Sequence, residues 1–402
     1  MSTAFASIGL NVLVTVLYKQ VFDITGDELD IGFLGLAQFV PAVLLVLVSG
    51  WVADRFDRRR VSALFLVGRV ICALAFLGYS MTDPTSVWPF FVIAFVFGGV
   101  DAMLVPSRRS IAPLIAPAEQ FPSVVALWTA TFTASSILGP VVGGFLYSIG
   151  PDLAYVVAAA VQLLAVVPLF GLVYAREPER NRDRPTLSAA LEGLRFVRRT
   201  PIVLAAISLD LFAVLFGGAV ALIPAIASER LGVGDIAYGW LRAAPGIGAA
   251  AMALFLAVRP VQRRVGPTLL VVVAVFGAGT VVFGLTRSYL VAFVALIVIS
   301  AADMVSMYIR GSLVPLATPD DQLGRVNAVE GVFIGASNEL GAFESGVAAR
   351  ALGLPWAIAG GGLVTIGIAG LFAVLFPSLR RIDTFDEVRP PGVPAGVSPA
   401  NG

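Results

Sequence analysis

The chain alternates long apolar runs with short polar connections from one end to the other. Each run is about 20 residues long, the length that an α-helix needs to cross a hydrocarbon core of about 30 Å. The runs lack the regular polar and apolar alternation of outer-membrane barrel strands, so they predict spanning helices. Hydropathy, turn residues and charge together predict twelve helices, at about residues 3–22, 32–53, 61–81, 88–106, 121–148, 152–175, 201–226, 235–257, 266–285, 289–310, 323–350 and 355–377.

The composition supports a location in the bilayer. Of the 402 residues, 58% are hydrophobic and 13% are charged, and the mean hydropathy is +0.91. A soluble domain carries about 25% charged residues, so this chain has too little charge to cover a water-exposed surface. We therefore predict an all-α membrane protein. The net charge of +1 gives no overall field that would attract nucleic acid.

The positions of the arginines predict how the helices are oriented. The even-numbered connections carry Arg55, Arg58, Arg59, Arg60, Arg108, Arg109, Arg176, Arg180, Arg182, Arg184, Arg195, Arg198, Arg199, Arg259, Arg263, Arg264, Arg310 and Arg325. The odd-numbered connections hold few basic residues and carry the acids Asp23, Asp27, Glu28, Asp30, Asp83 and Asp152. Because positive charge accumulates on the cytoplasmic side, we expect a multi-pass protein of the plasma or inner membrane with both termini in the cytoplasm.

The sequence repeats itself at an offset of 202 residues. At this offset Asp101 falls on Asp303 and Arg108 falls on Arg310, and the segments between them align without a gap. Two six-helix units that run the same way through the membrane are a parallel repeat, an architecture of secondary transporters. In such proteins the substrate site lies near the midplane between the halves, and transport is a rocking of one half against the other.

This organisation divides the chain into four parts. We predict an N-terminal six-helix bundle at 1–175, a cytoplasmic central loop at 176–200, a C-terminal six-helix bundle at 201–377 and a disordered cytoplasmic tail at 378–402. In the central loop, Leu187, Leu191 and Leu194 recur at helical spacing and basic residues follow them. This pattern favours a short amphipathic helix on the inner leaflet, and an ordinary solvated linker is the alternative.

The connection after the second predicted helix carries a distinctive pattern of charges, GWVADRFDRRRV at 50–61. It resembles the loop signature between helices two and three of the major facilitator superfamily. The matching positions are Gly50, Asp54, Arg55, Arg58 and Arg59, whereas Asp57 stands where the family has glycine. The resemblance implies that Asp54 faces the N-terminus of helix eleven and acts in gating, since a carboxylate there is favoured by about 0.3 to 1 kcal/mol. Alternatively, the arginines simply hold this loop in the cytoplasm.

A second motif lies in the fifth predicted helix, where Gly139, Pro140, Gly143 and Gly144 form the sequence GPVVGG. It resembles the core of the signature that antiporter branches of the same superfamily carry. Proline removes a backbone hydrogen bond and glycines allow close helix approach, so the segment is bendable or tightly packed. The stretches DITGDELDIGFLGLAQFVPA and TPDDQLGRVNAV add a likeness to the branch of enterobactin and multidrug exporters.

Charged residues inside the predicted helices are candidates for function, because each costs at least about 2.5 to 3.5 kcal/mol at bilayer depth. Asp101 and Arg108 are seven residues apart on nearly one helical face, as are Asp303 and Arg310, which suggests a structural or gating role. The candidates for proton coupling or substrate contact are Asp210, Glu339 and Glu344, with Arg69 and Arg242 as possible partners. Fixed ion pairs or a water-filled vestibule are the alternatives. Other residues that suit a cavity wall are Trp128, Trp240, Asn11, Gln38, Gln162 and Asn338.

Several kinds of chemistry have no residues to perform them. The chain has no histidine and one cysteine, Cys72, and it lacks a phosphate-binding loop and a nucleophile elbow. We therefore expect neither an enzyme nor a resident metal or cofactor. Ala94 stands where proton-coupled relatives carry an arginine four residues before a glycine, so other residues would have to carry protons.

Together these features predict a twelve-helix carrier of the major facilitator superfamily. We expect a proton-coupled exporter of a small organic molecule, such as a siderophore or a drug, that works as a monomer. A uniporter or importer, and a non-transporting scaffold or sensor, are the alternatives.

Overall fold

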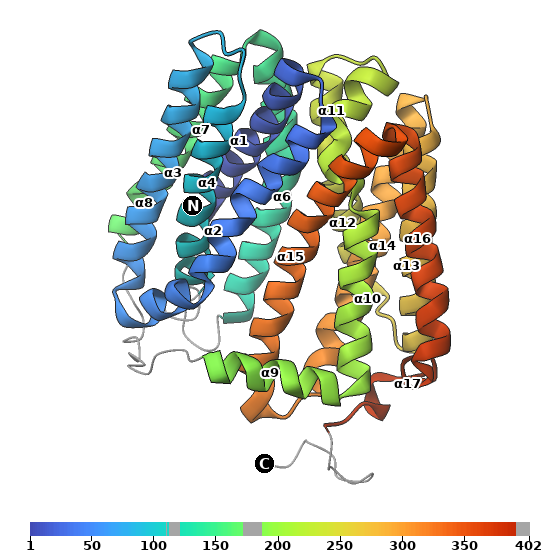
Figure 1. The fold of residues 1–402 in the computed structure, drawn as a ribbon. Helices are drawn as coiled ribbons and strands as arrows, with labels where there is room; N and C mark the ends of the chain where they lie inside the picture. The colour runs from blue at the N-terminus through green and yellow to red at the C-terminus, as the bar shows by residue number, and fades with distance from the viewer. Residues whose placement is uncertain (110, 112–120, 172–186, 391–402) are drawn as a thin grey trace.

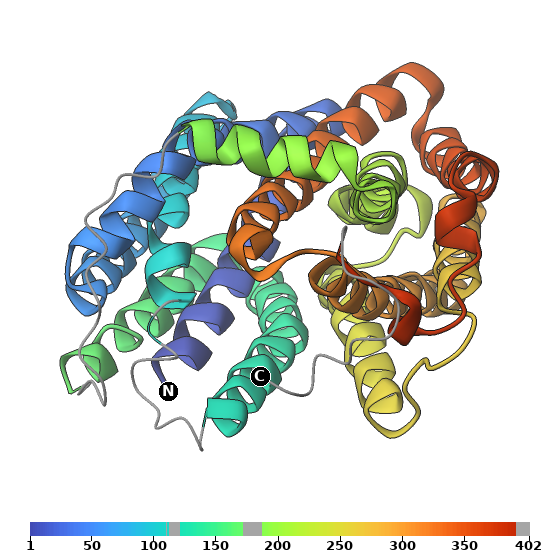
Figure 2. The ribbon, with the colours of Figure 1, turned by 90° about the horizontal axis from the view of Figure 1, so that it is seen from below.

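The computed structural model of the chain describes residues 1–109, 111, 121–171 and 187–390. These residues form helices and connecting turns, and no strand occurs among them. Figures 1 and 2 show two groups of helices side by side, blue to green for the first half of the chain and yellow-green to red for the second.

Each half contributes six membrane-crossing elements. In the first half they are α1 (Ser2–Thr25), α2 (Glu28–Arg55), α3 (Arg58–Ser80), α4 (Trp88–Arg109), α6 (Phe121–Ile149) and α7 (Pro151–Leu164), which α8 (Val167–Phe170) extends. In the second half they are α10 (Pro201–Gly217) with α11 (Ile223–Ala225), α12 (Asp235–Val258), α13 (Val265–Leu285), α14 (Tyr289–Leu316), α15 (Asp320–Leu352) and α16 (Leu354–Leu375). The predicted all-helical architecture of two six-helix units is confirmed.

Within the described residues, eleven of these elements are long and apolar enough to cross a membrane by themselves. The twelfth is α15, a helix of 33 residues that carries acidic and basic side chains along its length. It packs against α2, α10 and α16 within the bundle. Because it packs on these helices and lines the cavity described below, α15 can hold polar groups that lipid would not accept.

One predicted helix is broken in the structure. The run expected at 201–226 forms α10 up to Gly217, a 3₁₀ segment at Ala219–Leu222, then α11 and a π-helical turn at Ile226–Arg230. Pro224 lies inside this stretch and lacks the backbone N–H that a regular helix needs. Non-helical backbone at membrane depth is tolerated where protein or a cavity surrounds it, and this segment borders the cavity described below.

The amphipathic helix expected in the central loop is present as α9, Leu187–Arg199. It lies across one end of the bundle (Figure 2). Val197 is buried and Leu194 packs against the core of the second half, whereas Leu191 is exposed. Glu192 pairs with Arg325 at 3.1 Å, which fixes α9 against the beginning of α15.

The prediction of a disordered tail from residue 378 is wrong as far as residue 390. The chain continues as α17 (Pro377–Arg380) and a 3₁₀ turn at Phe385–Glu387. Leu379, Ile382 and Val388 are buried in the core of the second half, so apolar burial holds this stretch in place. Residues 391–402 of the expected tail lie outside the described residues.

The two halves touch at one end of the bundle, which we call the closed end. There the beginning of α2 meets the last turns of α15, and the end of α6 meets the beginning of α12. At the other end, the α9 end, residues 126–130 of α6 are exposed, and so are Gly331, Val332, Ile334 and Gly335 of α15. The close glycine contacts between the halves therefore lie from the middle of the bundle to the closed end.

Candidate functional site

A cavity of about 400 Å³ lies between the two halves. Its wall combines α1, α2 and α4 of the first half with α10, α12, α13, α14 and α15 of the second. The polar residues that line it are Tyr18, Gln38, Asp101, Arg242, Ser300, Asp303, Asn338 and Glu339. Apolar side chains fill the spaces between them, so the wall suits a molecule with both polar and apolar surface.

Two of the residues expected in a cavity wall, Gln38 and Asn338, line this one. Trp128, Trp240 and Asn11 are not among its lining residues. Gln162 is fully buried, and neither of its amide atoms has a hydrogen-bond partner among the described residues. The type of side chain alone therefore did not predict which of these residues line the cavity.

The first-half aspartate of the repeated motif is held by an arginine from a neighbouring helix. Asp101 of α4 forms an ion pair with Arg69 of α3, whose side chain is 3% exposed. Arg69 was proposed from the sequence as a possible partner for intramembrane carboxylates, and in the structure it pairs with Asp101. Arg108, which shares a helical face with Asp101, makes no ion pair within the described residues.

In the second half, the arginine of the repeated motif forms the ion pair, not the aspartate. Arg310 of α14 binds Asp210 of α10 at 2.7 Å, and its Nε donates to the hydroxyl of Ser306 at 3.3 Å. Both charged side chains are less than 10% exposed. The alternative of a fixed ion pair for Asp210 holds, but its partner is neither Arg69 nor Arg242, because α14 packs against α10 and presents Arg310 there.

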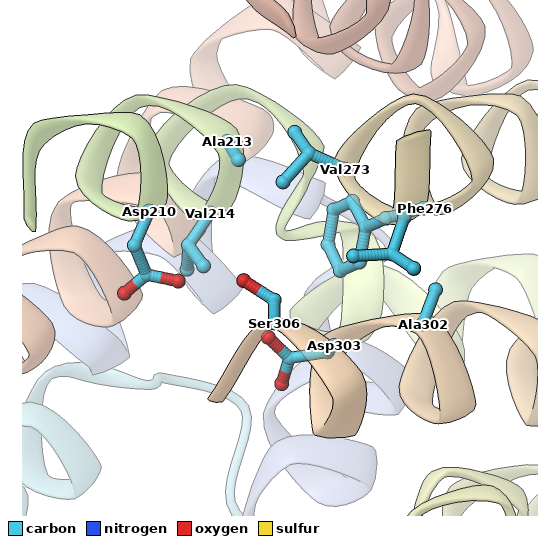
Figure 3. Close-up of a pocket in the computed structure, with 9 residues that line it drawn as sticks. Asp210, Ala213, Val214, Val273, Phe276, Ala302, Asp303 and Ser306 are labelled. Atoms are coloured by element: carbon cyan, nitrogen blue, oxygen red, sulfur yellow. The ribbon is translucent and has the colours of Figure 1, made fainter. Parts of the chain in front are cut away.

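Asp303 lies between this ion pair and the central cavity. It lines both the cavity and a small adjoining space of about 10 Å³, close to the volume that one water molecule needs. Figure 3 shows Asp210, Asp303 and Ser306 around this space, with Phe276 on its far side. Arg310 is engaged with Asp210, and Asp303 forms no ion pair in the described part of the chain.

Glu339 lies where the second half faces the first. A Cβ atom on Gly35 of α2 would be 3.0 Å from Glu339 Oε2 and 3.6 Å from the hydroxyl of Tyr18. Glu339 lines the cavity and has no ion-pair partner among residues that the structure describes. Its carboxyl group therefore belongs to one half and lies against the backbone of the other.

Arg242 does not pair with a carboxylate of the described residues. Its guanidinium group lies 5.2 Å from the centre of the Tyr18 ring, within the range of a cation–π contact. This contact crosses from α12 of the second half to α1 of the first. Glu344, the remaining predicted carboxylate of α15, is half-buried and is not among the cavity-lining residues.

The glycines of the GPVVGG motif pack α6 between two helices. A Cβ on Gly143 would lie 3.2 Å from Cβ of Thr15 in α1, whereas a Cβ on Gly144 would lie 2.5 Å from the carbonyl oxygen of Asp235 and 2.6 Å from Cα of Gly239. Gly139 faces α1, and the carbonyl oxygen of Pro140 is close to Gly239 of α12. One face of the motif thus packs within its own half and the other packs across the interface.

The repeat reproduces this arrangement in α15. Gly341 packs against the backbone of Leu215 in its own half, and Gly346 packs against Glu28 of α2, 2.8 Å from its carbonyl oxygen to the added Cβ. Gly341 and Gly346 are the repeat mates of Gly139 and Gly144. The pair of glycines therefore serves the same two contacts in both halves, one internal and one across the interface.

The charged loop after α2 begins α3 with a helix cap. Asp57 is the N-cap residue, and its carboxylate accepts hydrogen bonds from the backbone N–H groups of Arg59 at 2.8 Å and Arg60 at 3.3 Å. Aspartate before a helix is a known capping signal, so the sequence held this information. Arg55 ends α2, and Arg58 begins α3.

The predicted gating residue Asp54, like Gly50, belongs to the backbone of α2. The side-chain surroundings of both positions lie outside the described residues.

Polar contacts join the halves at the closed end. Lys19 of α1 binds Asp23 at 2.5 Å and reaches Asp235 of α12 at 3.4 Å. The hydroxyl of Tyr238 donates to the carbonyl of Thr15 at 2.9 Å. A more exposed pair, Arg350 with Asp27 at 2.7 Å, ties the last turn of α15 to the connection between α1 and α2. These contacts must separate if the closed end is to open.

Comparison with known proteins agrees with this architecture. The chain is 27% identical over 384 residues to the enterobactin exporter EntS of Citrobacter koseri, covering 92% of this chain and 86% of that protein. It is also 27% identical over 385 residues to the enterobactin exporter EntS of Escherichia coli O1:K1, with coverage of 92% and 87%.

Solved structures of transporters share the fold at lower identity. A bacterial homologue of the human lysosomal transporter Spinster, in an inward-facing and unoccupied conformation, superposes with a TM-score of 0.66 at 16% identity, covering 94% of this chain and 96% of that one. A POT family transporter in complex with 5-aminolevulinic acid gives a TM-score of 0.72 at 11% identity, with coverage of 94% and 96%.

A sequence model of a protein family also matches the chain. The model described as Major Facilitator Superfamily matches residues 1–333, most of the chain. This match agrees with the two six-helix units and with the cavity between them. The chain therefore belongs to the major facilitator superfamily and is a multi-pass secondary transporter of the membrane, not an enzyme.

Proposed function

We propose that this protein exports a small organic molecule by alternating access. The observation that carries the proposal is the cavity shared by the two halves, whose close glycine contacts lie from the middle of the bundle to one end. A site between two repeats is where a rocking transporter binds its cargo. The direction of transport is proposed from the curated relatives, which are named as exporters.

The orientation that we propose places the α9 end in the cytoplasm. Described arginines of the even-numbered connections, such as Arg58, Arg59 and Arg325, lie at this end, and positive charge favours the cytoplasmic side. The structure then corresponds to an inward-facing state, like the Spinster homologue that shares the fold. In this state the cavity receives cargo from the cytoplasm, and the closed end forms the barrier towards the outside.

The moving bodies that we propose are the bundles 1–175 and 201–377, linked by the loop at 176–200. The closed-end contacts of Lys19 with Asp235 and of Asp27 with Arg350 hold them together in the present state. For the opposite end we retain Asp54 and its neighbouring arginines as the gating group, on the strength of the sequence signature alone. One chain contains the whole cavity, so we propose that the monomer is the transporting unit.

Transport is tested first in cells that lack their own exporters and produce this chain. Accumulation of siderophores, lipophilic cations and antibiotics is measured with and without a protonophore. We expect lower accumulation of at least one compound, and we expect the protonophore to abolish the difference. Uptake instead of efflux would reverse the proposed direction, and efflux that the protonophore does not affect would exclude a proton-driven antiporter.

For proton coupling we propose Glu339 ahead of the other intramembrane acids. Asp210 is engaged by Arg310 and Asp101 by Arg69, so these carboxylates are committed to ion pairs. Glu339 has no such partner in the described residues, lines the cavity and lies against α2 of the opposite half. Rocking of the halves would change the surroundings of this carboxyl group. A group whose surroundings alternate can take up a proton on one side and release it on the other.

Replacing Glu339 with glutamine is expected to reduce efflux driven by a pH gradient at least tenfold. The amide keeps the size and hydrogen-bonding capacity of the side chain but cannot release a proton. Exchange of labelled for unlabelled cargo without a gradient, measured at saturating cargo, should continue, because it needs no net proton movement. Both rates are measured in vesicles that contain the purified protein.

The matched control is Glu344→Gln on the same helix, at a position that does not line the cavity. This variant should keep both gradient-driven efflux and exchange. If Glu344→Gln loses coupling while Glu339→Gln retains it, the assignment of the proton to Glu339 is wrong.

A further inference from the structure

We infer that the cargo site selects amphipathic organic cations over anions. This inference rests on the proposed function, because it names the chemical class of the molecule that the central cavity transports. It follows from the balance of charge on the cavity wall, from the groups that already have partners and from the apolar surface between them.

The charged residues on the wall are mainly acidic. Asp101, Asp303 and Glu339 line the cavity, and Arg242 is the one basic residue among its described lining residues. Low-dielectric walls that carry mostly one sign of charge concentrate ions of the opposite sign. The wall therefore attracts cations and repels anions.

Two of these acids are available to a ligand. Arg69 pairs with Asp101, and Arg310, which is near Asp303, pairs with Asp210. Asp303 and Glu339 form no ion pair with the described residues. An ionised carboxyl group inside a membrane protein is costly without a counter-charge, so an entering cation would supply what the protein itself does not.

The one basic side chain of the wall is held by an aromatic ring. Arg242 lies over the face of Tyr18, 5.2 Å from the ring centre. This contact uses the face of the ring that a cationic ligand would otherwise contact, and it places the guanidinium beside α1. The cavity thus presents one positively charged group, already in contact with a ring, against two unpaired acids.

The remaining wall is apolar and includes two aromatic rings. Phe97 comes from the first half and Phe276 from the second, with Leu10, Val14 and Ile299 near them. Aromatic faces bind organic cations through their negative quadrupole, and aliphatic side chains favour apolar substituents. A cavity of about 400 Å³ with this wall suits a bulky cation with an apolar surface better than a small hydrated ion.

Two probes of equal shape and opposite charge test the inference. Equilibrium dialysis of the purified full-length protein measures binding of tetraphenylphosphonium and of tetraphenylborate. We expect the cation to bind at least tenfold more tightly than the anion. Glu339→Gln and Asp303→Asn should each weaken cation binding about tenfold, which corresponds to about 1.4 kcal/mol. Asp386→Asn, on the exposed turn beyond α17, removes an acid far from the wall and should change nothing.

Equal or tighter binding of the anion would overturn the inference, as would unchanged cation binding in both cavity variants. A transport assay in vesicles separates this failure from failure of the proposed function. Movement of an organic anion, without binding of tetraphenylphosphonium, would keep the transporter and refute the cation site. Binding of the cation that depends on Glu339, with no probe moved across the membrane, would keep the site and refute transport.

Discussion

Replacing Gly144 with valine is expected to reduce transport at least tenfold by preventing the closed end from closing. A Cβ at this position would lie 2.5 Å from the carbonyl oxygen of Asp235 and 2.6 Å from Cα of Gly239. Both are backbone atoms of α12, which begins at Asp235. No side-chain rotation can therefore relieve the clash. The halves must separate where α6 crosses α12, and the cavity then opens at the end that the present state seals.

The separation is measurable as a distance between two spin labels. Ile149 at the end of α6 and Ile236 near the beginning of α12 are exposed and belong to different halves. Cysteines placed there, with the buried Cys72 replaced by alanine, accept the labels. Gly144→Val should lengthen the label distance and abolish efflux.

The control for this variant is Gly367→Val on α16, where an added Cβ meets no atom within 4 Å. It adds the same bulk to another membrane helix and should alter neither distance nor transport. Normal efflux by Gly144→Val would show that the close crossing is not required for the transport cycle.

The sequence was sufficient to predict the helices and the repeat. Long apolar runs leave the backbone few alternatives in lipid, since every peptide group must be satisfied within the segment. The same offset of 202 residues places Gly139 and Gly144 on Gly341 and Gly346, and the structure shows equivalent contacts for them.

Pairing between charged side chains could not be derived in the same way. The spacing of Asp303 and Arg310 indicates a shared helical face, but Arg310 binds Asp210 of another helix. The partner that a charged side chain binds depends on the rotation of its helix and on which helix lies beside it. Neither can be read from a single sequence. The repeat itself was misleading here, because the first half uses the aspartate of the motif and the second half uses the arginine.

Other features had a local signal in the sequence. Asp57 departs from the family signature, but it precedes a helix and is a favourable cap residue. In the tail, Leu379, Ile382 and Val388 are apolar and are buried in the structure, whereas the neighbouring prolines and glycines suggested disorder. Composition describes such a stretch as a whole and hides a few apolar anchors within it.

The ion pair of the second half gives the largest expected effect on stability. Arg310→Leu should lower the free energy of unfolding by about 3 to 5 kcal/mol, because it leaves a buried acid without its partner. Asp210 is 6% exposed, and its ion pair with Arg310 is the one that the described residues show for it. Thermal or denaturant unfolding of the purified protein, followed by intrinsic fluorescence, measures the loss.

A double variant shows whether Arg310→Leu destabilises the protein because the ion pair is lost or because Asp210 is left as an unpaired buried charge. Replacing both partners, as Asp210→Leu with Arg310→Leu, removes the unpaired acid as well and should recover most of the stability, since apolar pairs of similar volume often equal a buried ion pair. If the ion pair only stabilises the second half, the double variant should also transport. Restored stability without transport would instead show that Asp210, beside Asp303 at the edge of the cavity, takes part in the cycle itself. A double variant as unstable as Arg310→Leu would show that shape, and not charge, decides the packing of α10 against α14.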